Sequence, residues 1–539
     1  MKPLCFLLLI LCVWSFPAWA TPGLYNVREY GATGLKQDDA TGAIAKAIGA
    51  AKTAGGGVVQ VPPGEYTCLA IVLYDNITLQ LDAGAVLYAD LPNPAFKAES
   101  LIYAENAKNI AIRGRGKIDG QARYKWSDYD YGDVEIEKEV AIAQKAGVEM
   151  KRSYRVGNSA FTLLFKECQG ITIEDVTIEN TSLWCMRLWG SNEVKIRGVT
   201  IRSDLKMGVN SDGIDLDGTS NAQITDCTIS TGDDAICLKS GTWDFSGNGK
   251  TYPTENILVN NCILTSSSTA LMIGTETFSP IRHVIFSNCV IRQSNKGIGI
   301  NVQDGAVVSD IVYSNLTIDL HRRHWNWWGS AEVFYFVLKK RTPASRVGAI
   351  QNITVDNVIA YAQGTSRMVS TVGQPLANIR LSNVQVRMEP EATPDKRTTH
   401  AMLFSGVDGL QLNNLKVTWD DAAAEPGWQS GLVFEKVNNF QLQGIAARQG
   451  PLSSSLPAVS LTDCTKGVIS GCMAQPGTGT FLAVNGSATS ELIVHTNDLA
   501  HARTPLLLDK MVPKGSVVVH KPFQHPPVGT AKSRQQTDR

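Results

Sequence analysis

The sequence predicts an all-β solenoid, a parallel β-helix, with a short capping helix at its N-terminal end. Three observations support this fold class. A pattern of apolar residues recurs at a period within the 20–50 residue window that is typical of solenoids. The apolar spacing inside each copy is two, which excludes helical repeats. Cysteines take comparable places in successive copies, which indicates coils stacked on one another.

Each repeat consists of two short alternating runs with a polar pair between them. Residues 171–178 read ITIEDVTI, and residues 194–201 read VKIRGVTI. Strict alternation marks half-buried strands, and the polar pair marks a bend. Neighbouring coils then stack their aliphatic residues into ladders that form one continuous core. Further copies occur at residues 257–264, 284–291, 311–318 and 353–361, and later copies start at Ile379, Leu410 and Phe440.

The cysteines follow this repeat. The chain has eleven, of which two lie within the first 20 residues, so an odd number remains beyond them. Cys168, Cys227, Cys262 and Cys289 stand in comparable places, and no CxxC motif or Cys/His cluster accompanies them. We therefore expect stacked buried thiols, not a disulfide framework or metal ligands.

The N-terminal end predicts export. Lys2 precedes an apolar run over residues 4–16, and residues 18–20 form the small-residue pattern AWA. This arrangement is typical of a signal peptide, here residues 1–20, that is cleaved after Ala20. The apolar run is too short to span a bilayer comfortably, and no later run is long enough. We expect a secreted or periplasmic protein without membrane insertion.

The remaining chain divides into three predicted parts. Residues 21–57 form a cap segment, in which Asp38 and Asp39 can cap a short helix that covers the open first coil. Residues 58–502 form the β-helix. Residues 503–539 are rich in Lys, Pro, His and Gln without periodicity, which predicts a mostly disordered tail. The apolar face of the predicted helix contains Ile44, Ala47, Ile48 and Ala51.

Two insertions interrupt the repeat, and each is either a packed loop or a wall beside a substrate groove. Residues 121–157 contain several aromatic residues and a predicted helix over residues 133–150. Residues 321–345 contain three tryptophans within four positions. Exposed tryptophans stack on sugar faces, and neighbouring Arg and His side chains can contact an acidic sugar. We predict substrate contacts from His324, Trp325, Trp327 and Trp328.

Two acidic motifs carry the candidate chemistry. Residues 210–218 read NSDGIDLDG, and residues 231–240 read TGDDAICLKS. Asp212 and Asp233 are 21 residues apart, close to one coil, so we expect their backbones to lie one strand spacing apart, about 4.8 Å. Asp234 adds a third carboxylate. Like charges this close raise at least one pKa, which provides a proton donor beside ionised partners.

Two simpler interpretations of these motifs stay open. Aspartate next to glycine is a common turn former, and the corners of a β-helix need turns. Clustered carboxylates also suit a calcium ion. Two motifs one coil apart, each with glycines that let a ligand approach the backbone, favour a catalytic site instead.

In combination, residues 210–215 and 232–241 resemble the paired signatures of glycoside hydrolase family 28, the polygalacturonase family. The resemblance extends from the N-terminal cap region to about residue 320. It implies a right-handed parallel β-helix that hydrolyses α-glycosidic bonds in pectin with inversion, and without a metal or other cofactor. Asp233 corresponds to the general acid of the family. Asp212 and Asp234 correspond to the pair that activates water.

An inverting mechanism sets a geometric expectation for these residues. The acid and the base lie about 6.5–9.5 Å apart so that a water molecule fits between them. Asp233 and Asp234 are adjacent in the chain, so they reach that separation only if their side chains splay apart. A bend between strands allows this more easily than a regular helix.

The sequence departs from the family pattern where charged substrate contacts are expected. Thr269 stands at the position of a family histidine. Gly299 and Asn301 stand where the family has an Arg and a Lys that clamp the uronate carboxylate of the substrate. Because a bidentate cation clamp is much stronger than a neutral contact, plain homogalacturonan becomes a doubtful substrate. We predict that the substrate is contacted by Asn210, Thr269, Glu276, Lys296 and Asn301.

The leading hypothesis is an inverting glycoside hydrolase that acts on galacturonan- or rhamnogalacturonan-type polysaccharides or their oligosaccharides. A polysaccharide lyase on the same fold would need a bound calcium ion and a basic residue, and Lys239 is the one basic residue in the two motifs. A non-catalytic glycan-binding β-helix would not need carboxylates one coil apart. The 50 basic and 50 acidic residues balance, so nucleic acid is not an expected partner, and we expect a monomer.

Overall fold

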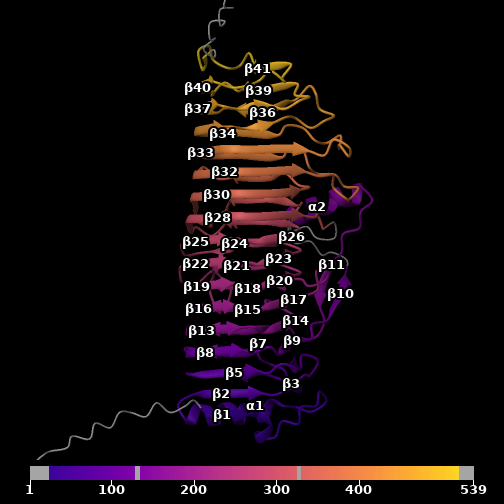
Figure 1. Ribbon diagram of the computed structural model, residues 1–539, viewed down its shortest axis with the longest axis vertical. Helices are drawn as coiled ribbons and strands as arrows, with labels where there is room; N and C mark the ends of the chain where they lie inside the picture. Colours follow the sequence, from indigo (N-terminus) through magenta and orange to yellow (C-terminus); the bar gives the residue numbers. More distant parts are fainter. Residues whose placement is uncertain (1–22, 128–133, 324–328, 521–539) are drawn as a thin grey trace, which may run out of the picture.

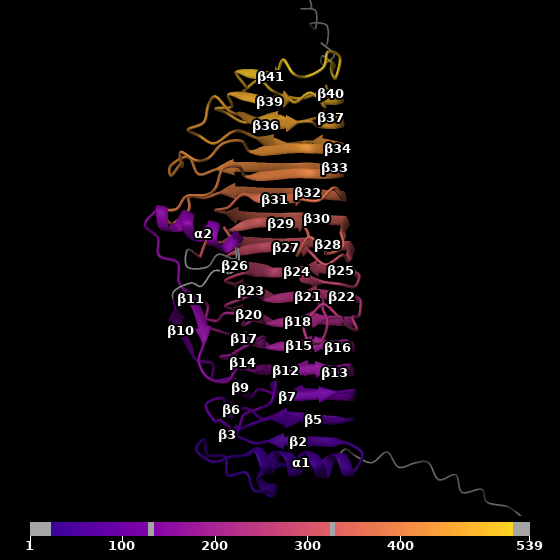
Figure 2. The same cartoon turned by 180° about the vertical axis from the view of Figure 1, so that it is seen from behind.

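Parallel strands of successive coils stack along one axis in the computed structural model (Figures 1 and 2). The structure describes residues 23–127, 134–323 and 329–520. The predicted right-handed parallel β-helix is confirmed. The predicted signal peptide lies outside the described residues. No helix within the described part of the chain is long and apolar enough to cross a membrane.

Most coils contribute one strand to each of three parallel sheets, and the longest strands bend from one sheet into the next. The first sheet contains β1 (Gly23–Asn26), β2 (Gly57–Val61), β5 (Ile77–Leu81), β8 (Lys108–Arg113), β13 (Gln169–Glu174), β16 (Asn192–Arg197), β19 (Ser220–Thr225), β22 (Thr254–Asn260), β25 (Ile281–Ser287), β28 (Val307–Leu320), β30 (Ala349–Ala362), β32 (Leu376–Met388), β33 (Met402–Trp419), β34 (Leu432–Gln443), β37 (Thr465–Ser470), β40 (Ser490–His495) and β42 (Val517–His520). The second sheet continues from β28, β30, β32 and β33 and also contains β3 (Gly64–Cys68), β6 (Ala85–Ala89), β9 (Lys117–Asp119), β14 (Thr177–Glu179), β17 (Thr200–Arg202), β20 (Thr228–Thr231), β23 (Ile263–Ser266), β26 (Val290–Ser294), β35 (Ala446–Ala447) and β38 (Met473–Ala474). The third sheet includes the first residues of β33 and β34 together with β4 (Ile71–Val72), β7 (Ser100–Glu105), β12 (Phe161–Lys166), β15 (Met186–Trp189), β18 (Ile214–Asp217), β21 (Ile236–Ser240), β24 (Thr269–Thr277), β27 (Lys296–Val302), β29 (Glu332–Leu338), β31 (Ser366–Ser370), β36 (Pro457–Thr462), β39 (Thr480–Asn485) and β41 (Thr504–Leu508).

Inward residues of the alternating strands stack coil on coil, as the repeat predicts. In the first sheet one ladder runs Ile171, Val194, Ala222, Ile257 and Val284, and every member is at most 2% exposed. The cysteines take part in the same packing. All nine described cysteines are buried and free, which confirms the prediction of stacked thiols.

The polar pair of each repeat forms the bend between the first and second sheets. Asn288, Asn315 and Asn357 adopt φ angles of 53°, 55° and 54°, in the left-handed region that asparagine tolerates better than most residues. Their side chains also form a ladder. The Asn315 Nδ2 donates to the Asn288 Oδ1 at 3.0 Å, and the Asn357 Nδ2 donates to the Asn315 Oδ1 at 2.8 Å. The polar pair therefore serves both the turn and the stacking.

The predicted capping helix is present as α1 (Thr41–Thr53), which follows the short 3₁₀ helix η1 (Val27–Tyr30) and lies beneath the first coil (Figure 1). The Thr41 N–H donates to the Asp39 Oδ1 at 2.8 Å, so this aspartate satisfies one of the free N–H groups at the helix start. The four predicted apolar residues of the helix are buried against the core.

The C-terminal end differs from the prediction. We predicted a disordered tail from residue 503, but β41 pairs in register with β39 and β42 pairs with β40, so the last coil continues to His520. The lysines and prolines of this segment mask two short apolar runs, residues 506–508 and 517–519, which supply the strands. Residues 521–539 lie outside the described residues.

The first insertion forms an arm along one side of the coils (Figures 1 and 2). Strand β10 (Tyr124–Ser127) pairs antiparallel with β11 (Arg152–Arg155), and α2 (Val134–Lys145) lies between them in the chain. The predicted helix over residues 133–150 was too long. It ends at Lys145 because Gly147 has a φ of 74°, which stops the helix, and the Val148 N–H then donates to the Ala143 carbonyl.

The second predicted insertion, residues 321–345, is wrong in part. Strand β29 lies within it and pairs with β27 and β31 in the third sheet, so this segment contributes a regular strand to the solenoid. Its aromatic residues 334–336 belong to that strand: Phe334 and Phe336 are buried in the core, and Tyr335 points to the other face. Residues 324–328 lie outside the described residues.

A stack of aromatic rings in the first sheet allows a test of the ladder packing. Phe286 stacks on Tyr313 with ring centroids 4.9 Å apart and is completely buried, whereas its neighbour Ile285 is 45% exposed. We expect Phe286→Ala to lower the free energy of unfolding by about 3–5 kcal/mol, because it leaves a cavity in the core. Ile285→Ala is the matched control and should change it by less than about 0.5 kcal/mol. Urea denaturation followed by circular dichroism measures both, and equal effects would contradict the inward and outward assignment.

Candidate functional site

The outer face of the third sheet brings the two acidic motifs together. The register pairs Ile214 with Ile236 and Asp215 with Cys237, an offset of 22 residues, and the Gly213 N–H donates to the Asp234 carbonyl at 2.9 Å. Asp212 is therefore aligned with Asp234. The expectation that it lies opposite Asp233 was wrong by one residue, because the loop between the strands is one residue longer than we assumed.

The same position on the next coils continues the row. Thr269 follows Asp234, since the Thr269 N–H donates to the Asp234 Oδ1 at 2.9 Å, and the register then pairs Thr269 with Lys296 and Lys296 with Glu332. Residues far apart in the chain thus form one line of polar side chains across five coils. This line forms the floor of a cleft of about 510 Å³.

Asp212, Asp233 and Asp234 form a tight carboxylate cluster in that floor. One oxygen atom from each lies within 4.8 Å of those of the other two, and the residues are 3%, 8% and 7% exposed. The cleft leaves them open to a ligand at one side. The cluster could also hold a divalent cation, because three carboxylate oxygens at this spacing suit a hard metal ion.

Backbone and amide contacts orient two of the three carboxylates. The Asp234 N–H donates to the Asp233 Oδ1 at 2.9 Å, and the Asn210 Nδ2 lies 3.5 Å from the Asp233 Oδ2. The Asp233 carbonyl accepts hydrogen bonds from the hydroxyls of Thr231 and Ser266, each at 2.7 Å, which hold the turn. The Asp212 Oδ1 is buried and has no hydrogen-bond partner within the described residues.

Burial and mutual repulsion keep a proton in this cluster. Burial raises the pKa of Asp233 to about 7, and the charge of Asp234 adds to the effect, while Lys239 and Lys296 oppose it. Burial also raises the pKa of Asp212 well above its ordinary value, with the charge of Asp233 as the next cause. At neutral pH the cluster therefore combines a proton donor with carboxylates that can accept hydrogen bonds.

A buried cation lies beside the cluster. The Lys239 Nζ is 3.0 Å from the Glu276 Oε2, 3.2 Å from the Gly274 carbonyl and 3.9 Å from Asp215. Burial lowers the pKa of Lys239, but the surrounding acidic groups raise it well above its ordinary value. Burial raises the pKa of Glu276, yet the charge and hydrogen bond of Lys239 bring it down to about 2. Lys239 and Glu276 thus form a permanently charged pair.

A second buried ion pair supports the wall of the cleft. The Arg187 Nε and Nη2 both donate to the Asp217 Oδ2, at 3.0 and 2.8 Å, and Arg187 also donates to the carbonyls of Thr242 and Trp243. The Arg187 guanidinium lies 5.7 Å from the ring of Trp184, which lines the cleft. The sequence analysis missed this pair, although Asp215 and Asp217, at alternate positions of an otherwise apolar stretch, were a signal for buried charge partners.

The structure places the predicted contact residues as follows. All five members of one group line the cleft with the carboxylates, namely Asn210, Thr269, Glu276, Lys296 and Asn301. The other group, His324, Trp325, Trp327 and Trp328, lies outside the described residues, although Gly329 and Ser330 just after it line the cleft. Further lining residues that the sequence analysis did not single out are Glu139, Glu332, Lys339, Arg341 and Arg367.

The arm borders this cleft. Glu139 of α2 lines it and forms an ion pair with Arg397, on a loop that follows β32. Arg155 of β11 donates to the Val209 carbonyl at 3.3 Å and to the Asn210 Oδ1 at 3.4 Å, so the arm also holds the loop before Asp212. Of the two interpretations of residues 121–157, these contacts favour the wall.

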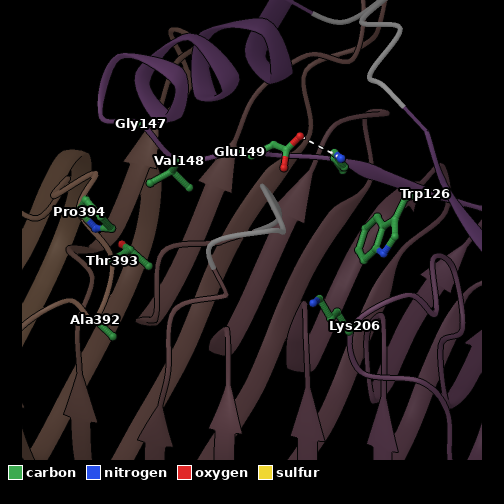
Figure 3. Close-up of a pocket in the computed structure, with 9 residues that line it drawn as sticks. Trp126, Gly147, Val148, Glu149, Lys206, Ala392, Thr393 and Pro394 are labelled. Carbon is green, nitrogen blue, oxygen red and sulfur yellow. Dashed lines mark ion pairs between the residues drawn. The ribbon is translucent and has the colours of Figure 1, made fainter.

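A second hollow of about 560 Å³ lies between the arm and the coils (Figure 3). Trp126 and Lys206 line one side, Thr393 and Pro394 line the other, and Val148 comes from the arm. The Lys206 Nζ lies 5.8 Å from the Trp126 ring. This hollow shows that the arm stands partly clear of the β-helix.

Comparison with known proteins identifies relatives of this chain. The sequence profile of glycosyl hydrolases family 28 matches residues 58–402. A probable polygalacturonase from Vitis vinifera is 26% identical over 242 residues, which cover 41% of this chain and 45% of that protein. An exo-poly-alpha-D-galacturonosidase from Dickeya chrysanthemi is 27% identical over 298 residues, with 48% of each chain covered. This chain thus spans about half the length of these relatives.

Two solved structures share the fold. A hyperthermoactive exopolygalacturonase from Thermotoga maritima aligns with a TM-score of 0.57 and 22% identity, and the alignment covers 74% of this chain and 92% of that one. A family 28 exopolygalacturonase from Yersinia enterocolitica aligns with a TM-score of 0.59 and 18% identity, and the alignment covers 78% and 79%. The family profile matches more than half of this chain, and the carboxylate cluster lies within the match. The chain therefore belongs to glycosyl hydrolases family 28.

Proposed function

We propose that this protein is an inverting glycoside hydrolase that cleaves α-glycosidic bonds in galacturonate-containing pectic polysaccharides or their oligosaccharides. One observation carries the proposal: three buried carboxylates from two neighbouring coils converge at the floor of an open cleft, within the segment matched by the family 28 profile. The names of the polygalacturonase relatives support the choice of a galacturonate-containing substrate.

The cluster supplies both proton transfers that hydrolysis needs. Asp233 donates its proton to the glycosidic oxygen as the bond from that oxygen to the anomeric carbon breaks. Asp212 and Asp234 hold a water molecule whose oxygen bonds to the anomeric carbon, and one of them takes the released proton. The balance is one water consumed and two sugar ends released. Asp233 regains its proton from solvent, and the other carboxylate returns its own.

The carboxylate spacing fits one bound water. Two oxygens within 4.8 Å can both accept a hydrogen bond from the same water, since each bond spans about 2.8 Å. The spacing is shorter than the predicted separation of about 6.5–9.5 Å for an inverting pair. Inversion in this proposal therefore rests on the family resemblance and not on the distance between the carboxylates.

The geometry disfavours a lyase. A lyase base must lose its proton, but Lys239 is held by Glu276 at 3.0 Å and its pKa is raised well above its ordinary value. A permanently protonated lysine cannot take a proton from the substrate. We also propose that residues 1–20 direct export, so that the enzyme meets its substrate in the periplasm or outside the cell.

Asp233→Asn tests the general acid. We expect it to lower kcat on polygalacturonate or its oligosaccharides by about 10²–10⁴-fold, because asparagine cannot donate the proton. Asp226→Asn is the matched control. This residue lies at a coil corner with a φ of 58°, which asparagine also tolerates, and full activity is expected. Reducing-end assays across a panel of pectic substrates measure both, and full activity of Asp233→Asn would contradict the assigned role.

The chemistry of the products separates hydrolysis from elimination. We expect new reducing ends without the ultraviolet absorbance of unsaturated sugars, because water and not a base-generated anion attacks. Activity is expected to persist in the presence of a chelator, since the proposed steps use only carboxylates. Proton NMR of the first product should show the inverted anomer. Unsaturated products, or inactivation by chelation, would instead favour a lyase with calcium at the carboxylate cluster.

The raised pKa of Asp233 predicts the alkaline limb of the pH profile. Its pKa of about 7 means that the proton-bearing form predominates below pH 7 and is lost above it. We therefore expect kcat/KM to fall as the pH rises through about 7. Initial rates from pH 4 to 9 measure this limb. A profile that stays flat to pH 9 would show that Asp233 is not the proton donor.

The same cluster should lower the stability of the folded protein at neutral pH. A carboxyl group whose pKa is raised on folding favours the folded state at low pH, and this contribution is lost as the pH rises from about 4 through the folded pKa. Asp212→Asn removes the charge and should stabilise the protein by about 1–2 kcal/mol at pH 8, but little at pH 4. Thermal unfolding at both pH values, with Asp226→Asn as control, provides the test. Destabilisation at pH 8 would contradict a strained cluster.

A further inference from the structure

The two ends of the solenoid are finished differently (Figure 1). At the N-terminal end, α1 lies beneath the first coil and buries its apolar face against the core. At the C-terminal end the last strands are β41 and β42, and in the described part of the chain β41 pairs with β39 alone and β42 with β40 alone. Stacked repeats need a cap at each end, because the last unit otherwise exposes its core and its strand edges.

The apolar ladders of the core reach the C-terminal end without a cover from the described residues. The register places Leu508 next to Val484 of the preceding coil, and their exposed fractions are 47% and 0%. It likewise places Val519 next to Val494, and here the exposed fractions are 53% and 6%. The same inward positions are thus buried one coil earlier and open to solvent in the last coil.

Strand β42 also lacks the features that keep exposed edges from pairing. Its residues 517–519 are three consecutive valines, and its register with β40 is regular. Natural proteins protect an exposed edge with lysine, proline or a bulge, since its free N–H and C=O groups can pair with another chain. We call the last coil the end surface, after its exposed apolar residues Leu507, Leu508, Met511, Val518 and Val519. Apolar residues gathered in this way mark an interaction surface.

The sequence that follows β42 is poorly suited to cover this surface. Residues 521–539 contain three prolines, at positions 522, 526 and 527, and proline has no N–H group to donate to a strand edge. Phe523 and Val528 are the only large apolar residues in this segment, so it has neither the alternation of a strand nor an apolar face like that of α1. A second copy of the chain, in contrast, brings a matching edge and matching apolar residues.

We propose that the end surface binds the end surface of a second copy of this chain, so that two β-helices pack end to end. Because both copies use the same surface, a two-fold axis relates them and the pair is closed. Strand β42 then pairs antiparallel with β42 of the other copy, and Leu508 and Val519 of both copies join the two cores. The proposal departs from the monomer expected from the sequence. It is independent of the proposed function, since no described residue of the last coil lines the cleft.

Sedimentation velocity of the full chain tests the proposal. We expect a particle with twice the mass of one chain, which dissociates on dilution. Leu508→Lys and Val519→Lys each place a charge in the contact and should raise the dissociation constant by about tenfold or more. Ile359→Lys is the matched control, because Ile359 is 46% exposed on the outer face of β30, and it should change the constant by less than about twofold.

Hydrogen exchange gives a second readout that needs no substitution. The N–H groups of β42 that point away from β40 should exchange more slowly at high protein concentration than at low concentration, because the second copy protects the edge. If a lysine variant does not fold, by circular dichroism, this measurement on the unsubstituted protein still decides.

Three results would overturn the end-to-end pair. These are a monomer at every concentration, an assembly that both lysine variants leave intact, and protection of β42 that does not depend on concentration. The last result would show that the chain covers its own end. All of these measurements are made without substrate, so a failure of the proposed function would not alter their outcome.

Discussion

Hydrogen bonding between coils is the constraint on which the rest of this structure depends. Within the coils, strands pair in parallel with those of the neighbouring coils, so coils repeat about every 4.8 Å along the axis. A side chain at one position of the third sheet must therefore face its counterparts one coil away. That constraint turns residues separated by 22, 27 or 36 positions into neighbours and builds the polar row from Asp212 to Glu332.

The same constraint forces like charges together. Asp212 and Asp234 cannot move apart without breaking the register of β18 and β21, and burial, together with the charge of Asp233, raises the pKa of Asp212. Nearby charges are compensated in pairs, with Lys239 on Glu276 and Arg187 on Asp217. Within the part of the chain that the structure describes, no cation lies within ion-pair distance of the three carboxylates of the cluster. The stacked coils of the β-helix do not need charged side chains for their stability. The presence of three carboxylates at this point therefore agrees with a chemical role.

Irregular segments define the edges of the cleft that the regular coils leave open. The arm contributes Glu139 and holds the loop before Asp212 through Arg155, while its far side stands away from the coils and leaves the second hollow. Gly329 and Ser330, just before β29, also line the cleft. The solenoid thus supplies the floor and its charges, and the arm and the residues before β29 supply further lining.

The sequence by itself determined the fold class and the identity of the three clustered carboxylates, because both follow from short local patterns. Alternation at period two, the polar bend and the two acidic motifs need only a few consecutive residues. The tertiary structure decided what depends on coil length, which varies from one turn to the next: the alignment of Asp212 with Asp234, the ion pair of Lys239 with Glu276, and the approach of Arg367 to the cleft. Only the hydrogen-bonded register of distant strands determines which of these side chains meet.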